Sequence, residues 1–117
     1  MLFLEYPPCS TCKKAKKWLD DNGIVYEARH IKQNNPNYEE LEQWLNRSGM
    51  PVKKFFNTSG LVYKSLELKD RLPGMSLEEQ LKLLSTDGML VKRPLLVGED
   101  FVLIGFKEKE WAEKLLK

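Results

Sequence analysis

The sequence predicts an α/β fold with the element order strand, helix, strand, helical insert, strand, strand, helix. Three observations predict it: an apolar strand leads directly into a helix, a second β-rich segment follows that helix, and two β-rich runs around a turn precede a final amphipathic helix. The first strand, helix and second strand imply a parallel pair joined by a right-handed crossover. With 117 residues, the chain is expected to form a single domain, residues 1–117.

The first strand and helix are predicted from residues 2–23. Residues 2–6 are a short apolar, aromatic-rich run, which is typical of a buried strand. Two prolines follow, and each biases the preceding residue towards an extended backbone, so the helix cannot begin before Cys9. Ser10 and Thr11 are the expected N-cap candidates, and Gly23 is expected to close the helix. Its apolar face is formed by Cys12, Ala15, Trp18 and Leu19.

A helical insert is expected from about residue 37 to residue 88, after a second strand at residues 24–31. Two sequence signals for capping boxes lie in it, Asn37 with Glu40 and Ser76 with Glu79. The expected segments are a helix at 37–49, a short helical turn at 50–56, a weak helix at 63–72, and a helix at 76–88 with Leu77, Leu81 and Leu84 inside.

The remainder of the chain predicts a β-hairpin and a terminal helix. Residues 89–106 hold two β-rich runs around a turn at residues 98–100. Pro94 cannot donate a hydrogen bond to a neighbouring strand, so it is expected at the first edge of its own strand. Residues 107–117 place their apolar side chains on one side, which predicts an amphipathic helix packed on the sheet.

Cys9 is the expected nucleophile of this chain. It lies where the first helix begins, so it faces backbone N–H groups that have no partner within the helix. These donors, the positive end of the helix dipole and the ammonium groups of Lys13 and Lys14 all favour a thiolate over a thiol. Cys12 lies three residues further on, at a separation that permits a disulfide. We therefore expect Cys9 to attack a substrate and Cys12 to resolve the adduct.

Other roles for the two cysteines fit the sequence less well. A structural zinc site needs four ligands, and the chain has only these two cysteines and one histidine, His30, so no metal is expected. A structural disulfide would close a very short loop and constrain the unfolded chain little. His30 itself is either a general base or an ordinary side chain at the end of a strand.

Composition gives no sign of nucleic-acid or membrane binding. The net charge is +2, and the lysines at residues 13–17 are read as a solvated helix face rather than as a nucleic-acid site. No apolar run is long enough to span a bilayer, and the N-terminus lacks the pattern of a secretory signal. A cytoplasmic location is therefore expected, where a cysteine pair is more often catalytic or redox-sensing than structural.

Four motifs together resemble one known family. They are residues 9–15 (CSTCKKA), residues 56–60 (FNTSG) with Tyr63 and Lys64, residues 92–95 (KRPL), and Gly105-Phe106 before the last helix. On these residues, nearly the whole chain resembles the arsenate reductase-related (ArsC/Spx-like) family of thioredoxin-like proteins, close to its small Spx- and MgsR-type members. Only the first motif is specific by itself.

This resemblance implies a thioredoxin-like mixed four-stranded sheet, a cis peptide before Pro94, and Arg93 facing the Cys9 sulfur as a third catalytic residue. A guanidinium and a helix N-terminus together suit an oxyanion. The residues that the resemblance places around it are Ser10, Thr11, Lys13, Asn57, Ser59 and Pro94. From the residues alone, the turn at 57–60 is equally well a simple connection. Arsenate reductases of this kind use further arginines in the regions matching 57–60 and 105–106, and this chain has none there.

Three functions follow as hypotheses. The first is a thiol–disulfide redox protein related to arsenate reductases, with an oxyanion or a thiol compound as substrate, no bound cofactor, and glutathione, glutaredoxin or thioredoxin as reductant. If arsenate is reduced, either Cys12 or glutathione would release the product from Cys9. The second is an Spx-like regulator whose cysteine pair senses oxidation and whose surface binds the RNA polymerase α subunit. The third is a retained fold without redox turnover.

Overall fold

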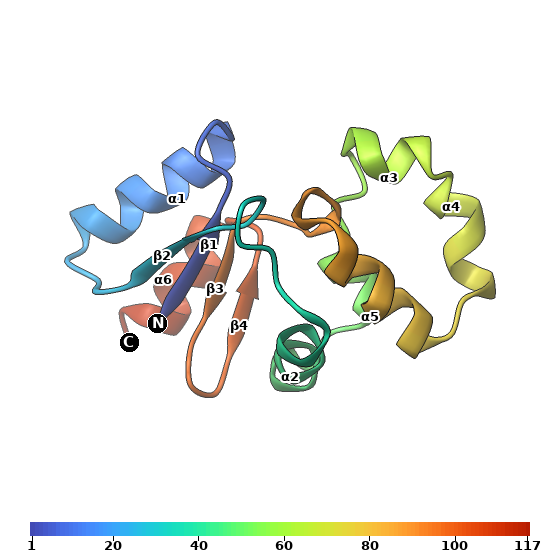
Figure 1. Cartoon of the computed structure of the whole chain (residues 1–117). Coiled ribbons are helices and arrows are strands. Elements are labelled where there is room, and N and C mark those ends of the chain that lie inside the picture. Colours follow the sequence, from blue (N-terminus) through green and yellow to red (C-terminus); the bar gives the residue numbers. More distant parts are fainter.

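A computed structural model describes all 117 residues of the chain. The centre of the fold is a mixed sheet with the strand order β2-β1-β3-β4 (Figure 1). β1 and β2 run parallel, whereas β3 runs antiparallel to both of its neighbours, β1 and β4. The strands are β1 (Leu2–Glu5), β2 (Glu27–His30), β3 (Leu95–Val97) and β4 (Val102–Ile104). The predicted α/β class with a thioredoxin-like mixed four-stranded sheet is confirmed.

Helices cover both faces of this sheet. The α-helices are α1 (Ser10–Asp21), α2 (Tyr38–Ser48), α3 (Leu61–Ser65), α4 (Leu68–Arg71), α5 (Leu77–Thr86) and α6 (Glu108–Leu115). Three short 3₁₀ helices complete the set: η1 (Val52–Phe55), η2 (Leu72–Gly74) and η3 (Gly88–Leu90). Figure 1 shows α1 and α6 on one side of the sheet and α2 to α5 on the other. Helices α2 to α5 all lie between β2 and β3 in the chain.

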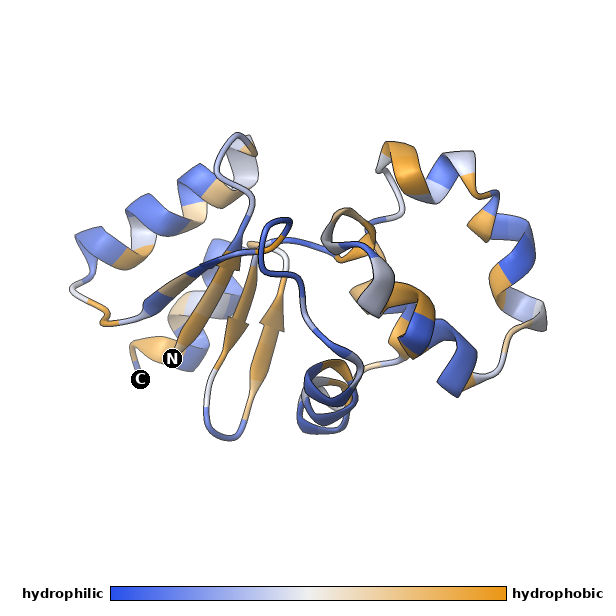
Figure 2. Cartoon of the chain, in the orientation of Figure 1, coloured by the Kyte–Doolittle hydropathy of each residue, from blue (hydrophilic) through white to orange (hydrophobic).

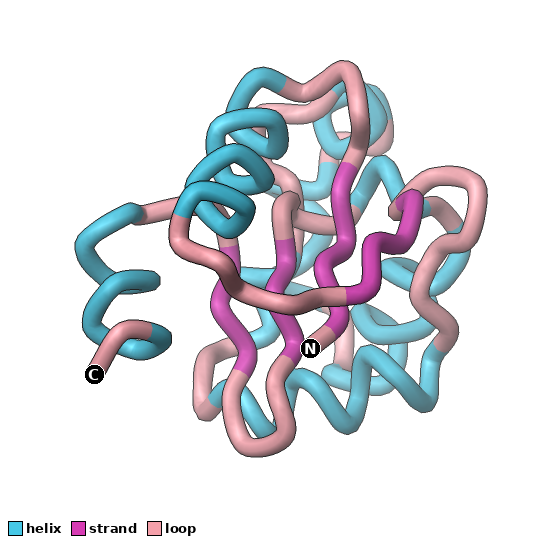
Figure 3. Tube along the Cα trace, turned by 90° about the vertical axis from the view of Figure 1, so that its left-hand side faces the viewer, coloured by secondary structure: helices cyan, strands magenta, loops and turns pink.

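Two apolar cores lie on the two faces of the sheet, because successive side chains of a strand point in opposite directions. Phe3 of β1 packs with α1 and α6, in a cluster with Ala15, Leu19, Leu96, Leu103 and Trp111. Leu4 points to the other face, where 17 buried residues join the sheet to α2, α4 and α5. Figure 2 shows the strands β1, β3 and β4 coloured as hydrophobic, and Figure 3 shows the strands side by side near the centre of the molecule.

Both predicted capping boxes are present. The side chains of Asn37 and Ser76 accept hydrogen bonds from the amides of Glu40 and Glu79, at 2.8 and 3.1 Å. The two carboxylates accept in return from the amides of the cap residues. At the other end of α2, Gly49 adopts φ +67°, the left-handed conformation that glycine favours. These local predictions are confirmed.

Three predictions in this part of the fold are wrong in detail. The weak helix predicted at 63–72 is replaced by α3 and α4, which are separated at Glu67, a residue with a left-handed backbone of φ +55°. Leu77 is 53% exposed, since it is the first residue of α5 and precedes the turns that carry Leu81 and Leu84 into the core. The second strand begins only at Glu27, and Val25 in the segment before it is 86% exposed.

None of the helices combines the length and the apolar character that a bilayer-spanning segment needs.

Candidate functional site at the start of helix α1

Cys9 is the N-cap residue of α1. After the turn formed by the two prolines, its amide donates to the Tyr6 carbonyl at 2.8 Å. Its own carbonyl accepts the first helical hydrogen bond, from the Lys13 amide at 3.0 Å. The expectation that Ser10 or Thr11 caps the helix is therefore wrong, because the proline turn already delivers Cys9 to this position with an extended backbone (φ −74°, ψ 125°).

The Cys9 sulfur is partly buried and faces the first amides of the helix. Burial by itself raises the pKa of this thiol, because it disfavours the charged form. The amides of Cys12 and Thr11 and the side chains of Cys12 and Arg93 lower the pKa of this thiol, and together they outweigh the burial. The pKa of Cys9 therefore lies below its ordinary value, as a nucleophilic thiolate requires.

Cys12 has the opposite character. Its side chain is fully buried, and the Tyr6 amide donates to its sulfur at 3.5 Å. Burial raises the pKa of Cys12 to about 12, and the neighbouring Cys9 adds to this shift through its hydrogen bond and its charge. The two thiols are free in this structure, with Cys9 partly accessible and Cys12 covered.

Arg93 reaches the site from the opposite end of the chain. It lies just before β3, and its peptide bond with Pro94 is cis. Its guanidinium lies over the Tyr6 ring, with Cζ at 5.0 Å from the ring centroid, and one nitrogen lies 4.0 Å from the Met89 sulfur. The guanidinium takes part in none of the ion pairs of the structure, so its charge is available to Cys9 or to a bound anion.

Five of the six other residues predicted to bind an oxyanion form two groups, and Pro94 lies apart from both. Ser10, Thr11 and Lys13 lie in the first turn of α1 with exposed side chains, beside Cys9. Asn57 and Ser59 belong to the turn before α3, where the Ser59 hydroxyl donates to the Asn57 side chain at 3.3 Å.

This second group is tied to the Arg93 segment and not to Cys9 itself. The Asn57 amide donates to the Leu90 carbonyl at 2.7 Å. No hydrogen bond of the structure joins Asn57 or Ser59 to Cys9 or Cys12. Pro94 is buried and directly precedes β3, where its missing N–H group removes no hydrogen bond between strands. The part of these residues in oxyanion binding stays a prediction.

His30 lies near the site but is already engaged. Its Nδ1 accepts hydrogen bonds from the amides of Lys32 and Gln33, at 3.2 and 3.1 Å. Its ring packs edge-on against Tyr6, with the ring centroids 5.9 Å apart. Of the two roles considered for His30, these contacts favour an ordinary side chain at the end of β2 over a general base. No group of three or more His, Cys, Asp or Glu side chains gathers anywhere in the structure.

Tyr6 is the residue that the sequence analysis missed. Its amide contacts the Cys12 sulfur, its carbonyl accepts from Cys9, and its ring supports Arg93. The available signal was its place, as the last residue of an apolar run directly before the two prolines and the CxxC pair. Met89, the other neighbour of Arg93, gave no such signal, because no pattern distinguishes it from a core methionine.

Several known proteins are similar to this chain in sequence and structure. A family model described as "ArsC family" matches residues 4–114 of this chain. YusI of Bacillus subtilis (strain 168) is 49% identical over 113 residues, which cover 97% of this chain and 96% of YusI. The regulatory protein MgsR of the same strain is 31% identical over 110 residues, covering 94% and 86% of the two chains. A crystal structure of an ArsC family-related protein from Bacteroides fragilis matches with a TM-score of 0.93 and 62% identity, over 96% of this chain and 94% of that one.

Proposed function

The chain belongs to the ArsC family, and from this we propose that it is a thiol–disulfide redox protein in which Cys9 attacks and Cys12 resolves. One observation carries the proposal: Cys9 is the partly accessible N-cap residue of α1 and Cys12 is buried beside it, so the pKa of Cys9 is lowered while that of Cys12 is raised to about 12. At neutral pH, Cys9 is then the available nucleophile and Cys12 stays protonated until it is needed.

With a disulfide as substrate, the reaction balances in two steps. The Cys9 thiolate attacks one substrate sulfur, a Cys9–substrate disulfide forms, and the other half of the substrate leaves as a thiolate. Cys12 then attacks the Cys9 sulfur, which gives a Cys9–Cys12 disulfide and releases the second half of the substrate; the proton of Cys12 passes to a departing thiolate. The substrate gains two electrons and the protein loses two. A second dithiol or two molecules of glutathione would return the protein to its reduced form.

The position of Cys12 suits it to act second. Burial is the main cause of its raised pKa, and the hydrogen bond and charge of Cys9 contribute further. Once Cys9 is bonded to a substrate sulfur, its negative charge is gone. The Tyr6 amide and the charge of Arg93, which both lower the pKa of Cys12, then act without that opposition. The formation of the adduct thus activates the thiol that resolves it.

A thiol or disulfide substrate suits the site better than arsenate does. Arg93 is the one arginine that contributes to the environment of Cys9. The segments at 57–60 and 105–106, where the resemblance implies further arginines, contain none. A hydrogen bond to a charged group contributes about 1.5–3 kcal/mol, so an arsenate bound here would lack much of its stabilisation. Turnover of arsenate with glutathione and glutaredoxin tests this point directly.

The rate of Cys9 alkylation by iodoacetamide, measured against pH, tests the activated thiolate. We expect the pH midpoint of the wild-type protein to lie below that of a free cysteine, which is about 8.5. Arg93→Ala should raise it, because the Arg93 side chain is one of the groups that lower the pKa of Cys9. Cys12→Ser keeps a donor next to Cys9 and should leave the midpoint low. Midpoints near the free-cysteine value in all three proteins would contradict the proposal.

Mass spectrometry after reaction with oxidised glutathione tests the roles of the two thiols. Wild-type protein should pass to an internal disulfide, Cys12→Ser should accumulate glutathione on Cys9, and Cys9→Ser should form neither product. An adduct that persists equally in wild type and Cys12→Ser would remove Cys12 from the reaction.

A second function is favoured by the similarity to MgsR, whose name marks it as a regulatory protein and whose sequence covers most of this chain. On this alternative, the same cysteine pair senses oxidation, and the protein binds the RNA polymerase α subunit as an Spx-like regulator. A pull-down with the purified α subunit, performed with reduced and oxidised protein, separates the two functions. Absence of binding in both states would remove the regulator.

A further inference from the structure

A second site lies apart from the cysteines, in a pocket of about 670 Å³. It is formed where the C-terminal end of α2 and η1 approach β4 and the start of α6. Its apolar part consists of Met50, Pro51, Phe56, Val102 and Ile104. Pockets that hold small organic ligands are commonly 300–1,000 Å³ and largely apolar, with a few polar groups that fix orientation. This pocket has the size of such a site.

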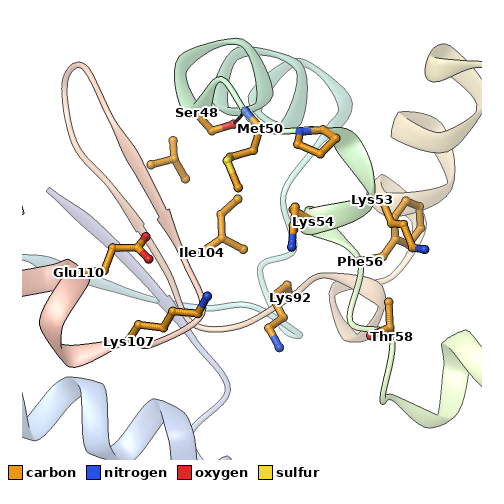
Figure 4. Close-up of a pocket in the computed structure, with 12 residues that line it drawn as sticks. Ser48, Met50, Lys53, Lys54, Phe56, Thr58, Lys92, Ile104, Lys107 and Glu110 are labelled. Atoms are coloured by element: carbon orange, nitrogen blue, oxygen red, sulfur yellow. Dashed lines mark hydrogen bonds between the residues drawn. The ribbon is translucent and has the colours of Figure 1, made fainter.

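Its polar part is dominated by positive charge. Four lysines line the pocket, Lys53, Lys54, Lys92 and Lys107, against a single acidic residue, Glu110. Figure 4 shows Met50 and Ile104 near the middle, with Lys54, Lys92 and Lys107 around them, while Lys53 lies further out. None of these five charged side chains takes part in an ion pair of the structure.

Four lysines and one carboxylate therefore share this pocket, although the whole chain carries a net charge of only +2. Lysines brought together from η1, the segment before β3 and the start of α6 repel one another when no anion lies between them. A ligand with several negative charges on a small group removes that repulsion. The apolar wall beside the lysines offers a surface to an uncharged ring.

We propose that this pocket binds an organic phosphate with an aromatic or apolar body, of the nucleotide class. A phosphate group concentrates more charge than a carboxylate does, which matches three ammonium groups around one space. Lysine binds phosphate as a point charge and needs no planar bidentate geometry. The body of the ligand lies on Met50, Ile104 and the neighbouring apolar side chains. Glu110 opposes the phosphate and limits the affinity.

ADP is the probe for this proposal, with pyrophosphate and adenosine as its charged and uncharged parts. Binding is followed by amide chemical shifts of ¹⁵N-labelled protein and by calorimetry. We expect ADP to bind most tightly, pyrophosphate more weakly and adenosine weakest. The shifts should centre on residues 48–58, 92 and 102–110. Affinity for ADP should fall with increasing salt, because the contacts are largely electrostatic.

Single substitutions then assign the charges. Lys54→Gln and Lys107→Gln should each weaken ADP binding about fivefold, the effect of one partly exposed ionic contact. Lys109→Gln is the matched control for Lys107→Gln, since it removes the same charge two residues further along the chain, at a residue that does not line the pocket. Glu110→Gln should strengthen binding. All four positions carry exposed side chains, so the fold is not at risk.

Three results would overturn the proposal. The first is the absence of saturable shifts with millimolar ADP. The second is an equal loss of ADP affinity in Lys109→Gln and Lys107→Gln, which would show that ADP binding depends only on the net charge of the protein. The third is a set of shifts centred on Cys9 and Arg93, which would assign the phosphate to the thiol site instead.

Discussion

Gly88 is the position where one added methyl group should do the most damage. A Cβ on this residue would lie 1.8 Å from the Ile31 carbonyl oxygen and 2.7 Å from the Ile31 carbonyl carbon. Non-bonded carbon contacts need about 3.5 Å, so the backbone of η3 and the backbone after β2 would have to separate. Gly88 does not adopt a left-handed φ, so glycine is needed here only because a side chain would collide with the Ile31 carbonyl.

The expected cost of Gly88→Ala is about 3 kcal/mol, at the upper end for an overpacked site, because the atoms it meets are backbone and cannot rotate away. For a chain of this size, that loss corresponds to a decrease of about 12 °C in the midpoint of thermal unfolding. The free energy of unfolding is measured in urea, and the midpoint by circular dichroism. Gly74→Ala is the control, since a methyl group there meets nothing within 4 Å.

The same substitution should act on the thiol. Gly88 lies five residues before Arg93, so a displaced η3 shifts the segment that carries the guanidinium. We expect the alkylation midpoint of Cys9 to rise in Gly88→Ala and to stay unchanged in Gly74→Ala. Equal stability of the two variants would refute the packing argument. A destabilised Gly88→Ala with an unchanged alkylation profile would refute the link to Arg93.

Two further substitutions test contacts near the sheet. Tyr6→Leu removes the ring under Arg93, a contact of about 0.5–1 kcal/mol, and should raise the pH midpoint of Cys9 alkylation. Tyr6→Phe keeps the ring and should leave this midpoint unchanged. Identical alkylation profiles of the two variants would exclude a supporting role for the ring. Glu40→Gln keeps its capping geometry but loses its charge towards Arg29, at a cost of about 1 kcal/mol near pH 7. The pKa of Glu40 is lowered, first by its hydrogen bond with Arg29, so this stabilisation is present above the unfolded-state pKa and is lost as pH falls through the folded-state value. Urea unfolding should therefore show a difference from wild type at pH 7 that disappears in acid, and a constant difference would contradict the assignment.

The sequence predicts the parts of this fold that depend on neighbouring residues. Asn37 with Glu40 and Ser76 with Glu79 form their capping boxes from side chains three residues apart, so the signal is local. The placement of Cys9 follows in the same way from the two prolines before it. Its helix begins one residue earlier than the caps suggest, because the N-cap role depends on the backbone at Cys9 more than on the chemistry of its side chain.

Features that depend on contacts between residues far apart in the chain could not be predicted from the sequence. Gly88 reads as an ordinary helix terminator, and only the folded chain reveals that the Ile31 carbonyl lies against it. The lysine pocket combines residues from three separate segments, none of which is unusual alone. Tyr6 gains its contact with Arg93 only when β3 pairs with β1.

The helical insert is joined to the Arg93 segment by one short stretch of backbone. Phe56 pairs with Val91, and the Lys92 amide donates to the Phe55 carbonyl at 2.8 Å. Arg93 follows directly and turns into β3 beside β1, whose last residues lead to Cys9. The insert therefore holds the backbone directly before Arg93, while the guanidinium itself lies over the Tyr6 ring. Lys92 belongs both to this segment and to the lysine pocket, so a phosphate bound there contacts the residue next to Arg93.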